Sequence, residues 1–145
     1  MNDEPAFFDT NILAYAFDQT EVLKREKCKK LVLPIFKGQK KGVVSNQVLA
    51  ELFFVLTQKV REPYEPEKAA RLIRGFLNAP NWIATNYSFE TVAKAAKLTA
   101  KKKTHFWDAL IGETMLENQV FEIITENEKD FSKIKQIKAI NPMKH

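Results

Sequence analysis

The chain has 145 residues, of which 45% are hydrophobic and 28% charged, and a formal net charge of +5. This length suits one domain with a single core, so residues 1–145 are expected to form one. No segment approaches the roughly 20 apolar residues of a membrane helix. The N-terminus lacks the pattern of a signal peptide, and the single Cys28 cannot form an internal disulfide, so a cytoplasmic protein is expected.

Short apolar runs alternate with longer helical patterns along the chain. Strands are predicted at residues 6–9, 42–44, 82–84, 121–125 and 138–140. Helices are predicted at residues 12–17, 21–37, 46–61, 66–78, 89–102, 106–118 and 128–131. This alternation is typical of βαβ units, in which helices cover both faces of a parallel sheet.

Two acidic residues stand near the first strand ends. Asp9 ends the first apolar run, and in open parallel sheets the carboxyl ends of the strands border the crevice where ligands bind. A carboxylate buried there needs a cation or hydrogen bonds to compensate for its lost hydration. Glu51 lies about 40° beyond the apolar arc of its helix, where it can face either solvent or that crevice.

Two later segments carry further polar groups. Asp108 lies in the first turns of a helix that is apolar nearly all round, Trp107 included, and such a helix is predicted to be buried. Backbone N–H groups at the helix start could satisfy this carboxylate, as a ligand would. The last long apolar run ends at Thr125, and the polar turn after it contains Glu126, Asn127 and Asp130. The turn is either an ordinary loop or a further part of a site.

These distant acids all project toward one edge of the predicted sheet. Like charges that lie close raise each other's pKa, and divalent cations are the usual compensation. Oxygen ligands without paired cysteines or histidines suit Mg²⁺ or Mn²⁺, as one or two ions. Because such ions activate water and hold phosphodiesters, the pattern indicates metal-assisted hydrolysis or phosphoryl transfer.

The ordered set of segments resembles a PIN domain over essentially the whole chain. The matching segments are Asp9-Thr10-Asn11, Glu51 in the helix after Ser45, Trp107-Asp108-Ala109-Leu110-Ile111, and Ile124-Thr125-Glu126-Asn127 through Asp130-Phe131. The compact size is most similar to VapC-type toxins of prokaryotic toxin–antitoxin pairs. The resemblance implies a three-layer α/β/α fold with a five-stranded parallel sheet in the order 3-2-1-4-5.

The resemblance also implies a Mg²⁺- or Mn²⁺-dependent endoribonuclease. By position, Asp9, Glu51 and Asp108 match the metal-binding acids of the family. Polar positions that support this site in the family match Thr10, Asn11 and Thr125. A cap for the following helix is the alternative role of Thr10 or Asn11.

The fourth acidic position of the family falls on Asn127, which adds no negative charge. Either a weaker second metal site or compensation by Asp130 or Glu126 would follow. His105 is expected to be an exposed residue at the helix start rather than a general base, because a metal-bound water needs none.

Basic and apolar surface residues suggest partners. RNA phosphates could be bound by Lys101, Lys102 and Lys103, with Arg71, Arg74, Lys94 and Lys97 extending that surface; a solvated helix end is the alternative. Eleven phenylalanines and two tryptophans exceed what a small core hides, which favours an apolar surface for a homodimer or an antitoxin. VapC-type proteins commonly use both, and the antitoxin would be a separate protein.

Two other functions are compatible with parts of the pattern. A haloacid-dehalogenase-type phosphatase also begins with Asp at its first strand tip, but it needs a second Asp where this chain has Asn11. A catalytically weak PIN-like module that binds RNA or protein would account for Asn127.

Overall fold

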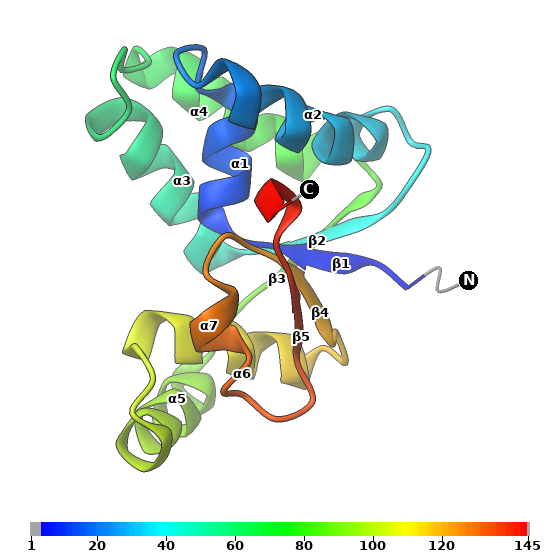
Figure 1. Ribbon diagram of the computed structural model, residues 1–145. Coiled ribbons are helices and arrows are strands. Elements are labelled where there is room, and N and C mark those ends of the chain that lie inside the picture. The colour runs from blue at the N-terminus through cyan, green and yellow to red at the C-terminus, as the bar shows by residue number, and fades with distance from the viewer. Residues whose placement is uncertain (1–3, 145) are drawn as a thin grey trace.

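The computed structural model describes residues 4–144, which form a central parallel sheet between two layers of helices (Figure 1). The strands are β1 (Ala6–Phe8), β2 (Gly42–Ser45), β3 (Trp82–Thr85), β4 (Glu122–Ile124) and β5 (Lys138–Ile140). They are all parallel and lie in the order β3-β2-β1-β4-β5. The predicted sheet and its order are confirmed.

Helices cover both faces of the sheet, as the alternation of elements predicts. One side carries α1 (Thr10–Phe17), α2 (Val22–Phe36), α3 (Asn46–Gln58) and α4 (Pro66–Asn78). The opposite side carries α5 (Phe89–Lys102), α6 (Phe106–Glu117) and α7 (Glu128–Phe131), as Figure 1 shows. A short 3₁₀ helix, η1 (Pro142–Lys144), was not predicted. Among residues 4–144, no helix is both long and apolar enough to cross a bilayer.

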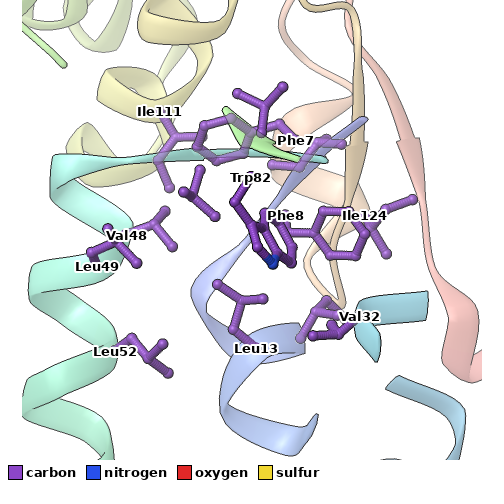
Figure 2. Close-up of a cluster of buried hydrophobic side chains, with 14 of the residues drawn as sticks. Phe7, Phe8, Leu13, Val32, Val48, Leu49, Leu52, Trp82, Ile111 and Ile124 are labelled. Atoms are coloured by element: carbon purple, nitrogen blue, oxygen red, sulfur yellow. The ribbon is translucent and has the colours of Figure 1, made fainter. Parts of the chain in front are cut away.

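The core forms on both faces of β1, because successive strand residues point to opposite sides. Figure 2 shows Phe7 beside Ile111 of α6, whereas Phe8 lies on the other side with Leu13 and Val32. Phe7 is fully buried, and the Phe8 ring packs edge-on against Trp82, with 5.2 Å between ring centroids. Burial of each such large side chain stabilises the folded protein by about 1.5–3 kcal/mol. The central strand is thereby held firmly at the point where Asp9 follows it.

Helix starts follow local capping chemistry. The Ser45 hydroxyl accepts the Val48 N–H at 3.2 Å and caps α3. Ser88 and Thr91 form a reciprocal capping box at α5. Asp9 itself occupies the N-cap position of α1 and accepts the Thr10 N–H at 2.7 Å, so neither Thr10 nor Asn11 is the cap. The helix can begin directly after the strand because the strand-end carboxylate also serves as its cap.

Candidate active site

Asp9 stands at the carboxyl end of β1, between the two neighbouring strands. Its side chain is only 6% exposed. Oδ1 accepts the Thr10 N–H at 2.7 Å, and Oδ2 accepts the Thr125 hydroxyl, also at 2.7 Å. Burial raises the pKa of Asp9 to about 6 in spite of these hydrogen bonds, with a smaller contribution from the charge of Glu51. Both carboxylate oxygens are thus oriented by donors that follow strand ends.

Glu51 reaches the same site from α3. Oε1 accepts the Thr10 hydroxyl at 2.6 Å, and Oε2 accepts Gln47 Nε2 at 3.1 Å. Of the two positions open to Glu51, the structure therefore favours the crevice over the solvated helix face. The same Gln47 nitrogen donates to the backbone oxygen of Trp107 at 3.0 Å, which ties α3 to the start of α6. Sequence reasoning missed Gln47, whose only signal is its position one turn before Glu51.

Asp108 contributes the third carboxylate, from the first turn of α6. Its pKa is raised to about 6, first by burial and then by the charges of Asp9 and Asp130. The like-charge contributions mean that these acids lie near enough to oppose one another's ionisation. His105 is largely exposed at the N-cap of α6, as expected, and its Nε2 lies 3.7 Å from Asp130 Oδ2.

Asn127 lies between two of these acids. Its Nδ2 donates to Asp108 Oδ2 at 2.7 Å and to Asp130 Oδ2 at 3.0 Å. Its backbone N–H donates to the Thr125 hydroxyl at 2.9 Å. The hydrogen bond from Asn127 holds the pKa of Asp130 below its usual range. The amide therefore acts as a neutral bridge at the position where the resemblance implied a fourth acid.

The other polar residues of the turn are bound elsewhere. Glu126 accepts the Tyr15 hydroxyl at 2.7 Å and lies 3.4 Å from Lys24 Nζ. The side-chain oxygen Oδ1 of Asn11 accepts the Glu126 backbone N–H at 3.3 Å, which fixes the turn against α1. With its carboxylate held by Tyr15 and Lys24, Glu126 is a poor replacement for the missing acid, whereas Asp130 is held directly beside Asn127.

The acids border an open groove of about 1230 Å³. Asp9, Glu51 and Asp108 line one part of it, and Lys59 and Arg61 line it beyond the end of α3. The basic residues that the sequence suggested for RNA binding do not lie together in this groove. Arg71 and Arg74 belong to α4, on the other side of the sheet from α5, which ends in the lysine run Lys101 to Lys103 (Figure 1).

None of those predicted basic residues lines the groove, so the structure does not gather them into the surface that was expected. Lys94 is paired with Glu117 at 3.0 Å. Lys59 and Arg61, which do line the groove, were missed, because α3 was predicted to continue to residue 61 and nothing in its periodicity marked its end as part of a site.

Trp107 also differs from the prediction. Its side chain is 59% exposed and lines the groove, although the apolar composition of α6 predicted a buried helix. Buried residues such as Ala109, Leu110 and Ile111 follow it immediately, so only the first turn of α6 emerges from the core.

The groove offers a cation carboxylate and amide oxygens rather than cysteine or histidine ligands. Within residues 4–144, no three histidine, cysteine, aspartate or glutamate side chains converge closely enough to bind one metal ion directly. The oxygen donors are nonetheless those that Mg²⁺ and Mn²⁺ use. Mg²⁺ commonly takes one or two carboxylates and keeps several waters, which fits acids that share a groove without converging.

Comparisons with known proteins agree with this architecture. A toxin–antitoxin complex from Klebsiella pneumoniae is 22% identical, with a TM-score of 0.64 and coverage of 94% of this chain and 97% of that one. VapBC2 from Rickettsia felis, bound to a promoter DNA fragment, is 20% identical, with a TM-score of 0.65 and coverage of 95% and 98%.

Mycobacterium tuberculosis VapC20, a toxin that cleaves the sarcin-ricin loop, is 15% identical, with a TM-score of 0.62 and coverage of 81% and 86%. No curated protein sequence matches the chain. At these identities the structural likeness establishes the fold. The model of the PIN domain family matches residues 6–137, nearly the full length, and the chain therefore belongs to the PIN domain family.

Proposed function

We propose that this protein is a Mg²⁺- or Mn²⁺-dependent endoribonuclease, the toxin of a VapBC-type toxin–antitoxin pair. The observation that carries the proposal is the meeting of Asp9, Glu51 and Asp108, from three separate elements, in one groove. Their oxygens are oriented by hydrogen bonds, and two of the three carboxylates have raised pKa values. A bound cation would stabilise such a site, because it would offset the repulsion between the carboxylates.

In this proposal, Asp9 and Asp108 would hold the cation directly, and the Glu51 carboxylate would add negative charge beside them. When bound, a divalent ion would polarise the phosphodiester and make water a stronger nucleophile. Thr125 and the Thr10 N–H keep the Asp9 oxygens aimed, while Gln47 and the Thr10 hydroxyl do the same for Glu51. The acids are thus preorganised, so little reorganisation is needed when charge develops during cleavage.

The biological partners follow from relatives of similar fold. The structure from Klebsiella pneumoniae is a toxin–antitoxin complex, that from Rickettsia felis is VapBC2 bound to promoter DNA, and they cover 94% and 95% of this chain. We propose a separate antitoxin for this protein on that ground. A homodimer stays a prediction; exposed aromatic residues such as Phe54 and Phe89 are compatible with it.

Metal binding and RNA cleavage test the proposal directly. Asp9→Asn removes one charge with little change of shape, and we expect it to lower Mn²⁺-dependent RNA cleavage by about 100-fold or more. Calorimetry should show a corresponding loss of Mn²⁺ affinity. Glu90→Gln is the matched control, because it removes an exposed acid from the first turn of α5, outside the groove. Equal cleavage by wild type and Asp9→Asn, without Mn²⁺ binding by either, would refute a metal-dependent catalytic site at Asp9, and no cleavage by the wild type would refute the nuclease.

A non-cleaving PIN module that binds RNA is the second candidate, favoured by the neutral Asn127 bridge. RNA binding by the wild type without cleavage at any Mn²⁺ concentration would select it. The phosphatase alternative has lost its support, because the chain belongs to the PIN family and the Asn11 side chain holds the turn at Glu126.

A further inference from the structure

Four aromatic side chains, from four different parts of the chain, line the groove that contains the acids. They are Tyr15, Phe54, Tyr87 and Trp107. No periodic motif in the sequence reveals them, because α1, α3, the β3–α5 connection and α6 each contribute one. Trp107 is the most exposed of the four, at 59%, and it directly precedes Asp108.

The Trp107 position is held from two sides. Its backbone oxygen accepts Gln47 Nε2 at 3.0 Å, and the Gln47 side chain also binds Glu51. The Trp107 ring packs edge-on against Phe106, with 5.1 Å between centroids and 77° between ring planes. The indole is therefore a pre-positioned apolar surface beside a carboxylate. A tryptophan carries a large apolar area, so leaving more than half of it in water favours a ligand that covers it.

The charges of the groove indicate which ligand fits. The acids lie together in one part of it, and Lys59 and Arg61 line it beyond the end of α3. A polyanion whose reacting phosphate lies at the acids would meet cations farther along the groove. Single-stranded nucleic acid combines phosphates with base faces that stack on aromatic rings, at about 1–3 kcal/mol per base. In a duplex those faces are already stacked, so it would gain less.

We propose that Trp107 is a stacking platform for an unpaired base next to the cleaved phosphodiester, with Lys59 and Arg61 binding phosphates farther along the strand. The proposal rests on the nuclease function above and adds the side chain that would hold an unpaired base of the RNA substrate. Trp107 thereby becomes a specificity-determining residue: it contributes to substrate binding and not to the proton or metal chemistry.

Intrinsic fluorescence tests this, because the chain has only two tryptophans and Trp82 is 4% exposed in the core. In an Asp9→Asn background, where cleavage is expected to be about 100-fold slower or more, a 12-nucleotide oligouridylate should quench the emission. An abasic oligomer of equal length and charge should quench it little. Asp9→Asn/Trp107→Phe should lose the quenching and keep most of the affinity measured with labelled RNA. Asp9→Asn/Trp107→Ala should bind oligouridylate about 5- to 150-fold more weakly and the abasic oligomer unchanged.

Phe89→Ala is the matched control, because Phe89 is 95% exposed at the start of α5 and does not line the groove. It should leave both affinities unchanged. Equal oligouridylate affinity with and without Trp107, or equal quenching by the abasic oligomer, would overturn the stacking role and leave the ring for a protein partner. If wild-type protein cleaves RNA and Trp107→Ala does so with the same KM, only the stacking inference fails. If wild-type protein does not cleave, the nuclease proposal fails, whatever the fluorescence shows.

Discussion

At the scale of single residues, Asn127 is where this chain departs from the acid pattern that the resemblance implied. Its neutral amide donates to Asp108 and Asp130 together, which is a connection that a carboxylate could not make. The amide satisfies part of the negative charge without a cation. If the protein binds a cation as proposed, a second metal ion would have to replace these hydrogen bonds, so we expect a single bound ion.

Asn127→Asp tests this reading. It would place a third carboxylate between Asp108 and Asp130 and remove both bridging hydrogen bonds. We expect the variant to bind a second Mn²⁺ and to lose about 1–3 kcal/mol of metal-free stability through repulsion between neighbouring like charges. Titration calorimetry gives the stoichiometry, and urea unfolding without metal gives the stability. An unchanged stoichiometry together with unchanged stability would contradict the bridging role.

Residue identity indicated the acids but not their partners. Asp9, Glu51 and Asp108 were singled out because a carboxylate beside apolar sequence is unusual, and they share one groove. Gln47 and Lys59 carry no such contrast on a helix surface. The sequence does not predict the exposure of Trp107, because a helix that is apolar on every side has no periodicity to distinguish its buried face from its exposed one.

At the scale of elements, the boundaries were predictable where local chemistry decides them. The Ser88 and Thr91 capping box and the proline at the start of α4 mark helix starts that match the prediction. The strands at the centre of the sheet are easily predicted from the sequence. Both of their faces are covered by helices, so their residues form nearly continuous apolar runs. The end of α3 was placed three residues too late, since the apolar spacing continues through Val60 after the helix has ended at Gln58.

Two glycines give a test of how tightly these elements pack. A Cβ at Gly42, the first residue of β2, would lie 2.6 Å from Ile35 Cδ1 and 2.8 Å from Trp82 Cζ3. Gly42→Ala should therefore lower the free energy of unfolding by about 1–3 kcal/mol. At Gly75 in α4 nothing lies within 4 Å of an added Cβ. Gly75→Ala should raise stability by about 0.5–1 kcal/mol, because alanine is the better helix former.

Urea unfolding of both variants at one pH gives this comparison with the same chemical change at each site. Opposite signs are expected. A neutral Gly42→Ala would mean that the side chains of Ile35, Trp82 and Phe8 move aside at little cost, and that the junction of β2 with the aromatic cluster is loosely packed.

At the scale of the whole molecule, holding ionised acids at the sheet edge lowers the free energy of unfolding. The pKa of Asp9 is about 6 in the folded protein against 3.8 for the free side chain. The folded state thus binds this proton more tightly than the unfolded state does. The stabilisation from Asp9 is complete below about pH 4 and is lost as the pH rises through 6, by at most about 3 kcal/mol. Asp108 acts in the same direction.

The carboxyls with lowered pKa values act in the opposite direction, but at lower pH. Glu117, Glu128 and Asp130 lose their stabilising contacts only as the pH falls below the ordinary range of carboxyl pKa values. Between pH 5 and pH 7, therefore, the metal-free protein should become less stable as the pH rises, and the raised pKa values of Asp9 and Asp108 should account for the change.

Asp9→Asn isolates this cost. Without metal, the variant should be more stable than the wild type by about 1–2 kcal/mol at pH 8. It avoids the burial of a charge, and this gain exceeds the loss from one weakened hydrogen bond. The advantage should disappear near pH 5, where Asp9 is largely protonated. Urea unfolding of both proteins at the two pH values measures it. Mn²⁺ at pH 8 should stabilise the wild type and leave the variant nearly unchanged, because a ligand of the folded state adds stability only where it binds. If Asp9→Asn is instead less stable at every pH, the hydrogen bonds from Thr10 and Thr125 outweigh the cost of burial, and the acid is structural rather than held at the expense of stability.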